Sequence, residues 1–397
     1  MSQFWSKEKL SIIAPSSPLK VANIKPDDSV WQLNLDCIEA GTGKLLDKKI
    51  LPYSSAGSST HWFSSDHVLY SKLRPYLNKV LLPNEVGLGT TELVPLLPNK
   101  SRLHREYLAY YLRSNQFVNW ISEQTAGAKM PRVSMKVFWE HQIPLPPLAE
   151  QQKIAAILDA ADNLRQKDQQ LVDHYTTLSQ SLFLEMFGDP VANPMGWEMK
   201  EASKYYQVRG RVGWKGYKKT DLRQEGAIVL GATHINKAGN IDLSKAVYLS
   251  DEKYLESPEI KVHRFDLIFV QRGNTIGKVA LVRDDLGEAT INPVVLIFRP
   301  VDANPYFLLY LLMNKRLNNQ FVGSNSGSAQ PMITQKTMKE FLMINVPINL
   351  QNRFAEKVKS IEAQKQQARA SLEKTNDLFN SLLQRAFNGE LTGNKAA

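Results

Sequence analysis

Hydrophobic residues recur at alternating steps of three and four in two long stretches of the chain. Eight of the ten positions in each series are apolar, which is typical of a heptad seam along a helix. The first series is Ile154, Ile157, Ala161, Leu164, Asp168, Leu171, Tyr175, Leu178, Leu182 and Glu185. The second series is Phe354, Val358, Ile361, Lys365, Ala368, Leu372, Thr375, Phe379, Leu382 and Ala386.

Helix-bounding residues flank both stretches. Prolines precede them at positions 144, 146, 147 and 347, and glycines follow at Gly188 and Gly389. A helix from Ile154 to Phe187 is about 50 Å long at about 1.5 Å per residue. Helices so much longer than those of ordinary globular proteins need a partner along the seam.

The chain also repeats itself at an offset of 200 residues. Lys79 and Val80 match Lys278 and Val279 at 199, so one residue of slippage separates them from the other pairs. A duplicated chain suits a partner that is itself roughly twofold, such as a DNA duplex or two identical subunits. The matches at 200 include Gly127, Pro131, Lys136, Glu140, Pro147, Ala155, Leu178, Ser181, Leu182 and Phe187, which recur as Gly327, Pro331, Lys336, Glu340, Pro347, Ala355, Leu378, Ser381, Leu382 and Phe387.

Short β-rich segments and buried helical segments alternate in the rest of each copy. Strands are expected at 68–70, 93–97, 267–270 and 294–298, and helices at 107–112 and 307–313. The fold class predicted is therefore α+β, with two pseudo-repeated mixed α/β domains joined by two long helices. The predicted segments are a first domain at 1–142, a helix and linker at 143–196, a second domain at 197–342 and a second helix at 343–397.

Charge favours pairing of the two helices with each other. The net charge is +10, divided as +5, −4, +6 and +3 over these four segments. Because the helical segments have opposite signs, we expect an antiparallel coiled coil within one chain. The alternative is that each helix packs on its own domain. Asp168 and Lys365 occupy seam positions, where a charge reduces stability and sets the register.

The globular domains hold most of the positive charge, which makes a polyanion the first partner to consider. Arginine reads guanine, asparagine and glutamine read adenine, and lysine suits phosphate, so basic and polar loops after the predicted strands are candidates for DNA contact. Any single basic residue of this kind is more often a solvated surface charge, and it is the clusters taken together that favour nucleic acid. The candidates are Lys72, Arg74, Tyr76, Lys79 and Arg132 in the first domain, and Arg209, Arg211, Lys215, Tyr217, Lys218, Lys219, His234, Gln271, Arg272, Asn274 and Lys278 in the second.

Composition argues against several other classes. Hydrophobic residues make up 43% and charged residues 22%, which is typical of globular proteins rather than disordered or membrane proteins. The longest apolar run, Phe307 to Met313, is too short to cross a bilayer. A single cysteine, Cys37, excludes internal disulfides and suits a reducing compartment, so we expect a cytoplasmic protein with no membrane partner.

The sequence shows no complete catalytic motif of the kinds that would indicate an enzyme. The segment from Gly41 to Lys44 resembles a phosphate-binding loop, but Ile38 replaces its first glycine and Leu45 its serine or threonine. Asn292, Pro293 and Val294 lack the second proline and the aromatic residue of an adenine methyltransferase motif. The seven histidines include no metalloprotease motif, so we expect no metal and no catalytic residue in this chain.

The run from Ile143 through Gln151 and Gln152, continued by the heptads to Phe187, Gly188 and Asp189, resembles a known family. It is similar to the central conserved region of the DNA-specificity (S) subunits of Type I restriction-modification systems. The second copy, with Pro347, Gln351, Phe354, Leu382, Phe387, Gly389, Glu390 and Leu391, resembles the distal conserved region, and the resemblance covers the whole chain. Ile348 and Asn349 depart from the first copy, where Leu148 and Ala149 stand.

The resemblance implies a mechanism. Each target-recognition domain would read one half of a bipartite DNA sequence, and the coiled coil would fix the spacer. Family members bind two modification subunits, which carry S-adenosylmethionine and methylate adenine at N6, and then motor-nuclease restriction subunits. The resemblance thus implies a non-catalytic subunit that needs no cofactor of its own and docks the methylases through its helices and the segments around Pro146 and Pro347.

Two alternatives stay open at this point. A single-chain methylase or nuclease would need the catalytic motifs that are missing. A coiled-coil scaffold whose domains bind protein would explain the heptads but not the charge of the two domains, and a steep dependence of binding on salt would separate it from a DNA-binding protein.

Overall fold

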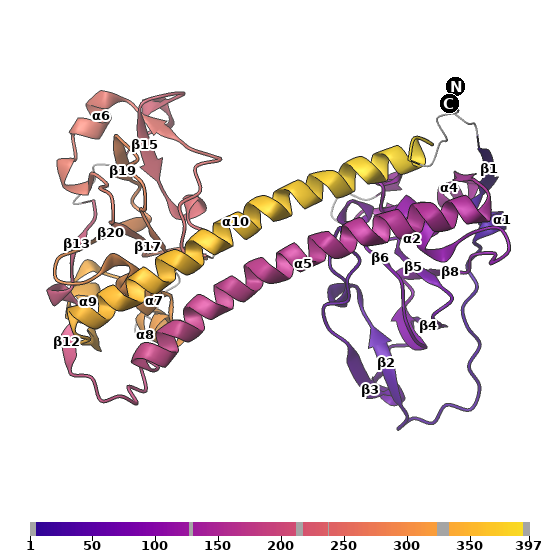
Figure 1. The fold of residues 1–397 in the computed structure, drawn as a ribbon, viewed down its shortest axis with the longest axis horizontal. Coiled ribbons are helices and arrows are strands. Elements are labelled where there is room, and N and C mark those ends of the chain that lie inside the picture. The colour runs from indigo at the N-terminus through magenta and orange to yellow at the C-terminus, as the bar shows by residue number, and fades with distance from the viewer. Residues whose placement is uncertain (1–4, 127–129, 212–216, 237, 324–332, 392–397) are drawn as a thin grey trace. The chain divides into compact units, whose positions relative to one another are not determined.

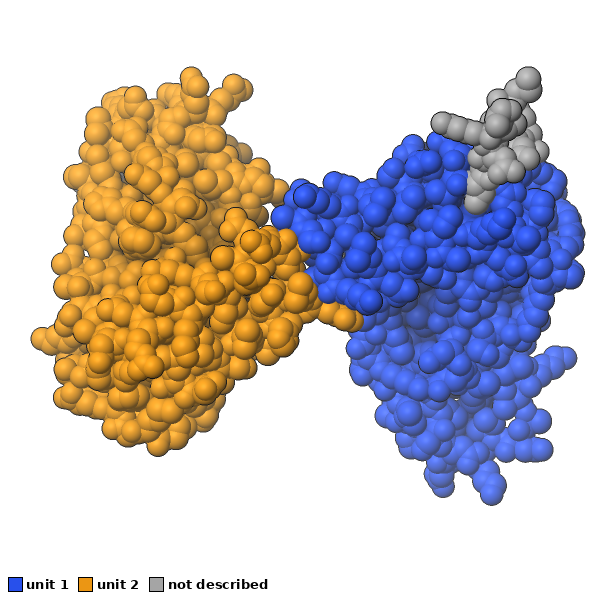
Figure 2. Space-filling view, viewed as in Figure 1, with its two compact units in different colours: residues 1–169, 370–397 blue, residues 170–369 orange. Residues whose placement is uncertain are grey.

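The computed structural model describes residues 5–126, 130–211, 217–236, 238–323 and 333–391. The chain forms two compact units, one of residues 1–169 and 370–397 and the other of residues 170–369 (Figure 2). Each unit contains one mixed α/β domain and half of each long helix, and the α+β fold class is confirmed. The units divide both helices in the middle, whereas the predicted segments keep each helix whole, so those four segment boundaries stay a prediction.

The first unit contains two main sheets. The helices are α1 (Leu10–Ile13), α2 (Arg105–Arg113), α3 (Asn115–Glu123) and α4 (Met135–Glu140). One sheet has the order β3 (Lys49–Pro52), β2 (Ser29–Leu33), β7 (Gly87–Thr90), β4 (Thr60–Phe63), and the other has the order β6 (Val80–Leu81), β5 (Val68–Ser71), β8 (Leu93–Leu96). Two further pairs are β1 (Ser6–Lys9) with β11 (Gln142–Leu145), and β9 (Thr125–Ala126) with β10 (Arg132–Val133). The first of these pairs ties the N-terminal strand to the residues that lead into the first long helix (Figure 1).

The second unit repeats this plan. Its sheets have the orders β13 (Tyr206–Arg209), β20 (Val295–Pro300), β17 (Leu267–Val270), β18 (Val279–Leu281), and β14 (Leu222–Arg223), β16 (Tyr248–Leu249), β15 (Ala227–Leu230), β19 (Ala289–Ile291). The remaining elements are β12 (Met199–Glu201), paired with β21 (Leu342–Ile344), and the helices α6 (Asp251–Leu255), α7 (Pro305–Met313), α8 (Lys315–Gly323) and α9 (Gln335–Glu340). In both units a parallel pair (β2 with β7, β15 with β19) accompanies an antiparallel one (β5 with β8, β17 with β20). The duplication in sequence is therefore a duplication of topology.

Each domain packs its core between a sheet and the helices that follow it. In the first unit Tyr70 of β5 stacks on Phe138 of α4, with ring centroids 4.8 Å apart. In the second unit Phe298 of β20 stacks on Tyr206 at 4.5 Å and on Phe269 at 5.0 Å. The strands and helices predicted around these positions are confirmed, because their continuous apolar runs are buried on both faces.

Two long helices, α5 (Leu148–Phe187) and α10 (Ile348–Phe387), have 40 residues each. Their length is about 60 Å, longer than the seams predict, because each begins directly after Pro147 or Pro347. A glycine follows the end of each helix in the left-handed conformation that favours glycine: Gly188 directly after α5 with φ of 75°, and Gly389 two residues after the end of α10 with φ of 77°.

The two helices pack antiparallel. In the first unit Phe387, at the end of α10, lies 5.3 Å from the ring of Tyr107, so the end of α10 packs where α5 begins. In the second unit Phe187, at the end of α5, packs against Phe307 at 5.1 Å and Phe354 of α10 at 5.3 Å. The predicted antiparallel pair is confirmed (Figure 1). Each helix contacts a domain at both of its ends, so neither helix packs on its own domain alone.

The predicted seam is confirmed for α10 but wrong for half of α5. The positions Ile157, Leu164, Leu171 and Leu178 are 37–47% exposed. The buried positions are one residue further on, for example Leu158 and Val172. The reason is that α5 steps by four and then three from Ile154, as α10 does from Phe354, whereas the sequence also allows the opposite order. Both predicted seam charges lie at the helix contact. Asp168 accepts hydrogen bonds from the hydroxyls of Ser371 and Thr375, each 3.0 Å, and Lys365 is buried.

Candidate nucleic-acid interface

Two equivalent loops carry half of the candidate residues. One loop, residues 72–79, joins β5 to β6, and the other, residues 271–278, joins β17 to β18. The same backbone hydrogen bond anchors both: Val133 N–H donates to the Lys72 carbonyl at 2.9 Å, and Ile333 N–H donates to the Gln271 carbonyl at 2.9 Å. The sequence repeat therefore places both loops at the same point of the topology.

The loops also share their backbone conformation. Arg74 and Asn78 have φ of 50° and 48°, and the corresponding Gly273 and Gly277 have φ of 96° and 87°. The left-handed region costs a side-chain-bearing residue about 1 kcal/mol, which glycine avoids. Leu77 N–H donates to the Arg74 carbonyl at 2.9 Å, as Ile276 N–H does to that of Gly273 at 3.1 Å. One scaffold thus presents different side chains in the two domains.

In the first loop the side chains separate into exposed and anchoring groups. Arg74 and Tyr76 are exposed, and Lys72 is half-buried. Lys79 instead donates from Nζ to the Leu35 carbonyl at 2.7 Å, which ties the loop to the turn after β2. Arg132 lies beside the loop because it pairs in a β-bridge with Leu73, the residue between Lys72 and Arg74.

The carboxylate of Glu92 holds the Arg132 side chain beside this loop. The Arg132 guanidinium donates to one Glu92 oxygen from Nε at 3.2 Å and from Nη2 at 3.1 Å. The same residue fixes the loop through its backbone, because Lys72 N–H donates to the Glu92 carbonyl at 3.0 Å. Lys72, Arg74 and Tyr76 of the loop therefore lie beside Arg132 of β10, at the end of β5.

In the second loop Arg272 and Asn274 are exposed, and Lys278 is half-buried. The Gln271 side-chain amide donates to the Pro293 carbonyl at 2.9 Å, so Gln271 serves the loop's structure. Arginine and asparagine side chains of this kind can make paired hydrogen bonds to base edges.

The basic and aromatic segment from Arg209 to Lys219 is partly outside the described residues, and Lys215 lies there. Arg209 donates to the Gln207 side chain at 2.8 Å. Arg211 donates from Nε to the Ile291 carbonyl at 3.1 Å and lies 5.7 Å from the Tyr217 ring. Burial lowers the pKa of Arg211 and raises that of Tyr217. Lys218 and Lys219 are exposed next to them.

His234 is packed into its own turn. Its Nδ1 accepts from Gly231 N–H at 3.0 Å, and its Nε2 lies 3.1 Å from the Lys245 carbonyl. With both ring nitrogens engaged and 4% of the residue exposed, its position fits a structural role better than a contact with DNA.

Burial also affects the histidine nearest the first loop. His61 contacts the Leu93 carbonyl through Nε2. Burial lowers the pKa of His61, and the charge of Lys72 lowers it further. The imidazole is therefore neutral near pH 7, and the positive charge at this edge comes from Lys72, Arg74 and Arg132.

Two glutamines that the sequence did not single out as site residues fix each domain to the start of a long helix. Gln151 accepts from His104 N–H through Oε1 and donates from Nε2 to the carbonyls of Arg102 and Pro146, all at 2.8 Å. Gln351 accepts from Asn304 N–H at 2.9 Å and donates to the Val346 carbonyl at 2.8 Å. The signal was present in the sequence, because both glutamines follow a proline at the same spacing and recur at the offset of 200.

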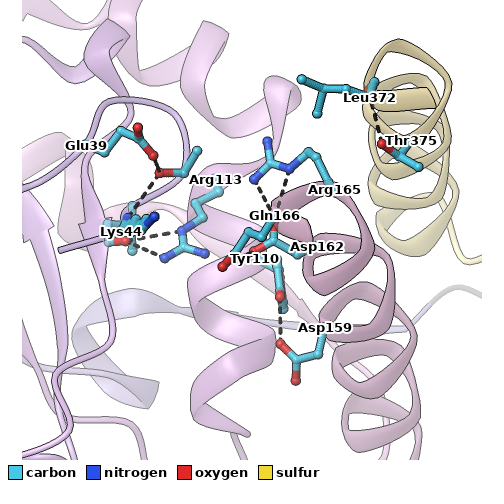
Figure 3. A network of polar contacts seen from close by, with 12 residues as sticks. Glu39, Lys44, Tyr110, Arg113, Asp159, Asp162, Arg165, Gln166, Leu372 and Thr375 are labelled. Carbon is cyan, nitrogen blue, oxygen red and sulfur yellow. Dashed lines mark hydrogen bonds and ion pairs between the residues drawn. The ribbon is translucent and has the colours of Figure 1, made fainter. Parts of the chain in front are cut away.

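A polar network in the first unit links the loop domain to α5 (Figure 3). Tyr110 donates from its hydroxyl to Asp159 at 2.6 Å. Arg113, next on the same helix face, donates to the Val80 carbonyl at 2.6 Å, directly after the first loop. On α5 itself Asp162 accepts from Arg165 Nε at 3.0 Å and from Gln166 at 2.8 Å.

The second unit forms an equivalent link with different residues. Arg283, which follows β18, forms a bidentate ion pair with Glu362 of α10. Tyr310, the counterpart of Tyr110, donates to Glu362 at 3.4 Å. Tyr110 and Tyr310 recur at the offset of 200, but Arg283 has no such signal in the sequence. These links hold each loop-bearing domain against a helix.

The described ranges contain no group of three or more histidine, cysteine, aspartate or glutamate side chains placed to hold a metal ion. Within the same residues, none of the helices is both long and apolar enough to span a membrane.

Comparisons with known proteins agree with one another. The family described as Type I restriction modification DNA specificity domain matches residues 80–173 and 213–374, which is more than half of the chain. The EcoDI specificity subunit of Escherichia coli is 27% identical over 154 residues, 38% of this chain and 34% of that protein. The MjaVIII specificity subunit of Methanocaldococcus jannaschii is 24% identical over 296 residues, 70% of this chain and 68% of that protein. The chain thus spans about a third of the first relative and about two thirds of the second.

A solved structure shares the fold. It comes from work on complex assembly and conformational transition of the type I R-M system, with a TM-score of 0.55, 19% identity and 98% of both chains covered.

Proposed function

The chain belongs to the Type I restriction-modification DNA specificity family, and from this premise we propose that its two domains each read one half of a bipartite DNA target. As a specificity subunit it recognises the DNA target and is the non-catalytic component of the Type I complex. We assign the two halves of the target to residues 1–142 and 197–342.

One observation carries the proposal. The loops 72–79 and 271–278 share anchoring hydrogen bonds and left-handed positions, yet their exposed side chains differ. Arg74 and Tyr76 in the first loop correspond to Gly273 and Thr275 in the second. A common scaffold with different side chains suits two domains that read two different sequences.

We propose direct DNA contact for nine members of the candidate set. In the first domain these are Lys72, Arg74, Tyr76 and Arg132, and in the second they are Arg272, Asn274, Lys278, Lys218 and Lys219. Lys79, Gln271 and His234 act through the shape of the loops, because carbonyl groups of the same domain engage their polar atoms.

In this proposal the helical pair fixes the spacing between the two halves of the DNA target. A helix of about 60 Å corresponds to roughly 18 base pairs at about 3.4 Å each. The bidentate Arg283–Glu362 pair and the glutamine anchors at Gln151 and Gln351 suit a stiff connection, since each joins a domain to a helix through several hydrogen bonds.

The chain is part of a Type I assembly, and we propose that its partners are two modification subunits followed by restriction subunits. S-adenosylmethionine and the N6-adenine transfer would belong to the modification subunits. Ile157 and Leu164 in the first unit, and Leu171 and Leu178 in the second, are exposed on α5 at seven-residue spacing. Exposed apolar residues repeated every seven positions suit the packing of a partner helix.

The test uses the chain together with its modification subunit and a pool of randomised DNA duplexes. We expect the bound fraction to contain two short specified segments separated by an unspecified spacer of constant length. The logarithm of affinity should fall steeply with the logarithm of salt concentration, because phosphate contacts release counterions. Binding that neither depends on salt nor enriches any sequence would favour a protein-binding scaffold instead.

A further inference from the structure

A pocket of about 500 Å³ lies between α10 and the second domain, entirely within the second unit. The wall formed by α10 includes the charged residues Lys359, Glu362, Lys365 and Arg369, and the opposite wall includes Arg283 and Tyr306. This volume is within the range of small-molecule sites, about 300 to 1,000 Å³.

The ammonium group of Lys365 has no direct ion-pair partner, although the carboxylates of Glu362 and Asp173 act on it from further away. The residue is only 9% exposed, and among the residues that the structure describes none forms a hydrogen bond or ion pair with its side chain. Burial lowers the pKa of Lys365 and the charge of Arg369 lowers it further, while the charges of Glu362 and Asp173 offset these effects only in part. A buried cation without a partner is unfavourable, so an anion in this pocket would be stabilised by it.

In the first half of the repeat, the residue equivalent to Lys365 has an acidic partner on its own helix. Arg165 stands at the position equivalent to Lys365, and its guanidinium donates to Asp162 one turn earlier (Figure 3). Glu362 is the counterpart of Asp162, but the bidentate pair with Arg283 occupies its carboxylate at 2.8 and 2.6 Å. Because Glu362 pairs with Arg283, it does not pair with Lys365, and Lys365 lines the pocket.

We propose that this pocket binds the phosphate group of a small molecule. Lys365 and Arg369 would hold the phosphate, with Lys359, which also pairs with Glu356 at 3.1 Å, next to them. Of the two acidic residues in the lining, Glu362 is neutralised by Arg283 and Asp284 is exposed to solvent. Leu281 and the Tyr306 ring supply an apolar wall for an organic group attached to the phosphate. This site is separate from the loops proposed to contact DNA.

The pocket favours a small phosphate over the backbone of a duplex. Lys365 lies in the helical seam and is nearly covered, so a phosphate must enter the pocket to reach it. A rigid duplex presents its phosphates on a convex surface, which suits exposed lysines better than a recessed one.

Calorimetric titration of the full chain with three probes tests the proposal. The probes are adenosine monophosphate, inorganic phosphate and adenosine, which differ in the phosphate and in the organic group. We expect both phosphates to bind and adenosine not to bind. Lys365→Met should weaken phosphate binding at least about tenfold, since a charge-assisted hydrogen bond is removed. Lys357→Met, on an exposed lysine of the same helix outside the pocket, should leave it unchanged.

The variant is expected to fold, because methionine retains the apolar stem and removes the unpaired charge. If Lys365→Met does not fold, Arg369→Gln on the exposed side of the pocket replaces it, with the same expected loss. Tighter binding of adenosine monophosphate than of phosphate identifies a phosphate ester as the ligand class, and equal binding identifies free phosphate. The proposal is overturned if phosphate does not bind, or if adenosine binds as tightly as adenosine monophosphate. It is also overturned if Lys365→Met weakens the binding of duplex DNA but not that of phosphate.

Discussion

Arg283 and Glu362 form two hydrogen bonds of 2.8 and 2.6 Å that join the second domain to α10. Both side chains are about one-fifth exposed, so solvent screens this ion pair only in part. The residues are 79 positions apart in the sequence, and the pair holds a loop-bearing domain against the helix proposed as a spacer.

Arg283→Ala should therefore destabilise the second unit. Removal of the guanidinium leaves the Glu362 carboxylate half-buried without its partner, at a cost of about 2 kcal/mol in the free energy of unfolding. Urea-induced unfolding measured by circular dichroism checks this value. Arg316→Ala is the matched control, because Arg316 is 62% exposed and pairs with Asp189 at the surface. The control should lose less than about 1 kcal/mol, and equal losses in both variants would contradict the role of the Arg283 pair.

Gln151→Ala should destabilise the first unit more than a change at its neighbour. The substitution removes one accepted and two donated hydrogen bonds and leaves His104 N–H and the Pro146 carbonyl without this partner. The expected loss is about 2 to 4 kcal/mol in the free energy of unfolding. Gln152→Ala, at the exposed next position, should change it by less than about 0.5 kcal/mol. Chemical unfolding of both variants gives the comparison, and a small loss for Gln151→Ala would remove the anchor from this account.

Substitutions in the two loops should separate the two half-sites. Arg74→Gly keeps the left-handed backbone that Arg74 shares with Gly273, so the fold should be as stable as before while the side chain is lost. Binding should weaken by about 1 to 3 kcal/mol at one half-site only, and Arg272→Ala should do the same at the other. Binding to duplexes altered in one half or the other measures this. Equal losses at both half-sites in either variant would contradict the assignment of one domain to one half-site.

The exposed apolar residues of α5 should matter for assembly rather than for folding. Leu171 is 41% exposed, so Leu171→Asp should leave the melting temperature of the chain nearly unchanged while weakening its association with the modification subunit about tenfold or more. Gln170→Asp introduces the same charge at the adjacent exposed position and is the control. Analytical ultracentrifugation of the mixed proteins measures the association. Normal assembly of Leu171→Asp would place the docking surface elsewhere.

Acid should destabilise the first unit through His141. Burial lowers the pKa of His141 to about 4, with a smaller contribution from the charge of Lys7. Its Nε2 lies 2.8 Å from the Tyr111 hydroxyl, and its ring lies 4.0 Å from that of Trp120. Because the folded pKa is below the unfolded value of about 6.5, the unfolded chain binds the proton first. Stability is thus fully present above about pH 6.5 and falls as the pH drops toward 4.

A pKa of about 4 against about 6.5 corresponds to about 3 kcal/mol, and the partial exposure of His141 reduces this loss to on the order of 2 kcal/mol. Unfolding measured at a series of pH values should show the decline between pH 6.5 and 4, together with a smaller one from His61, whose pKa burial also lowers. His141→Gln should reduce the decline, and His174→Gln, at an exposed position of α5, should not. An identical decline in His141→Gln and the native chain would contradict this assignment.

The sequence predicts the long elements well because their signals are local. Two glycine-bounded heptad series mark α5 and α10, and apolar runs mark β5, β17 and α7. The choice between Ile157 and Leu158 as a seam residue could not be made, because a 3-4 pattern and a 4-3 pattern from Ile154 share every second position and both select apolar residues in between. That choice depends on the opposing helix.

The sequence predicts where the two candidate loops lie in the repeat but not what each side chain contacts, and their contact with DNA stays a prediction. The repeat correctly places the two loops at equivalent points of the fold. It does not reveal that Lys79, Gln271 and His234 turn toward the carbonyls of Leu35, Pro293 and Lys245. These acceptors belong to other loops, so their proximity results from the tertiary fold rather than from any local pattern.

The most direct test of the central claim is modified-base sequencing of genomic DNA from cells that contain the modification subunit, with and without this chain. The account predicts N6-methyladenine at a split sequence motif that appears only when the chain is present. Unchanged methylation, with both proteins expressed and associated, would contradict the assignment of target recognition to this chain.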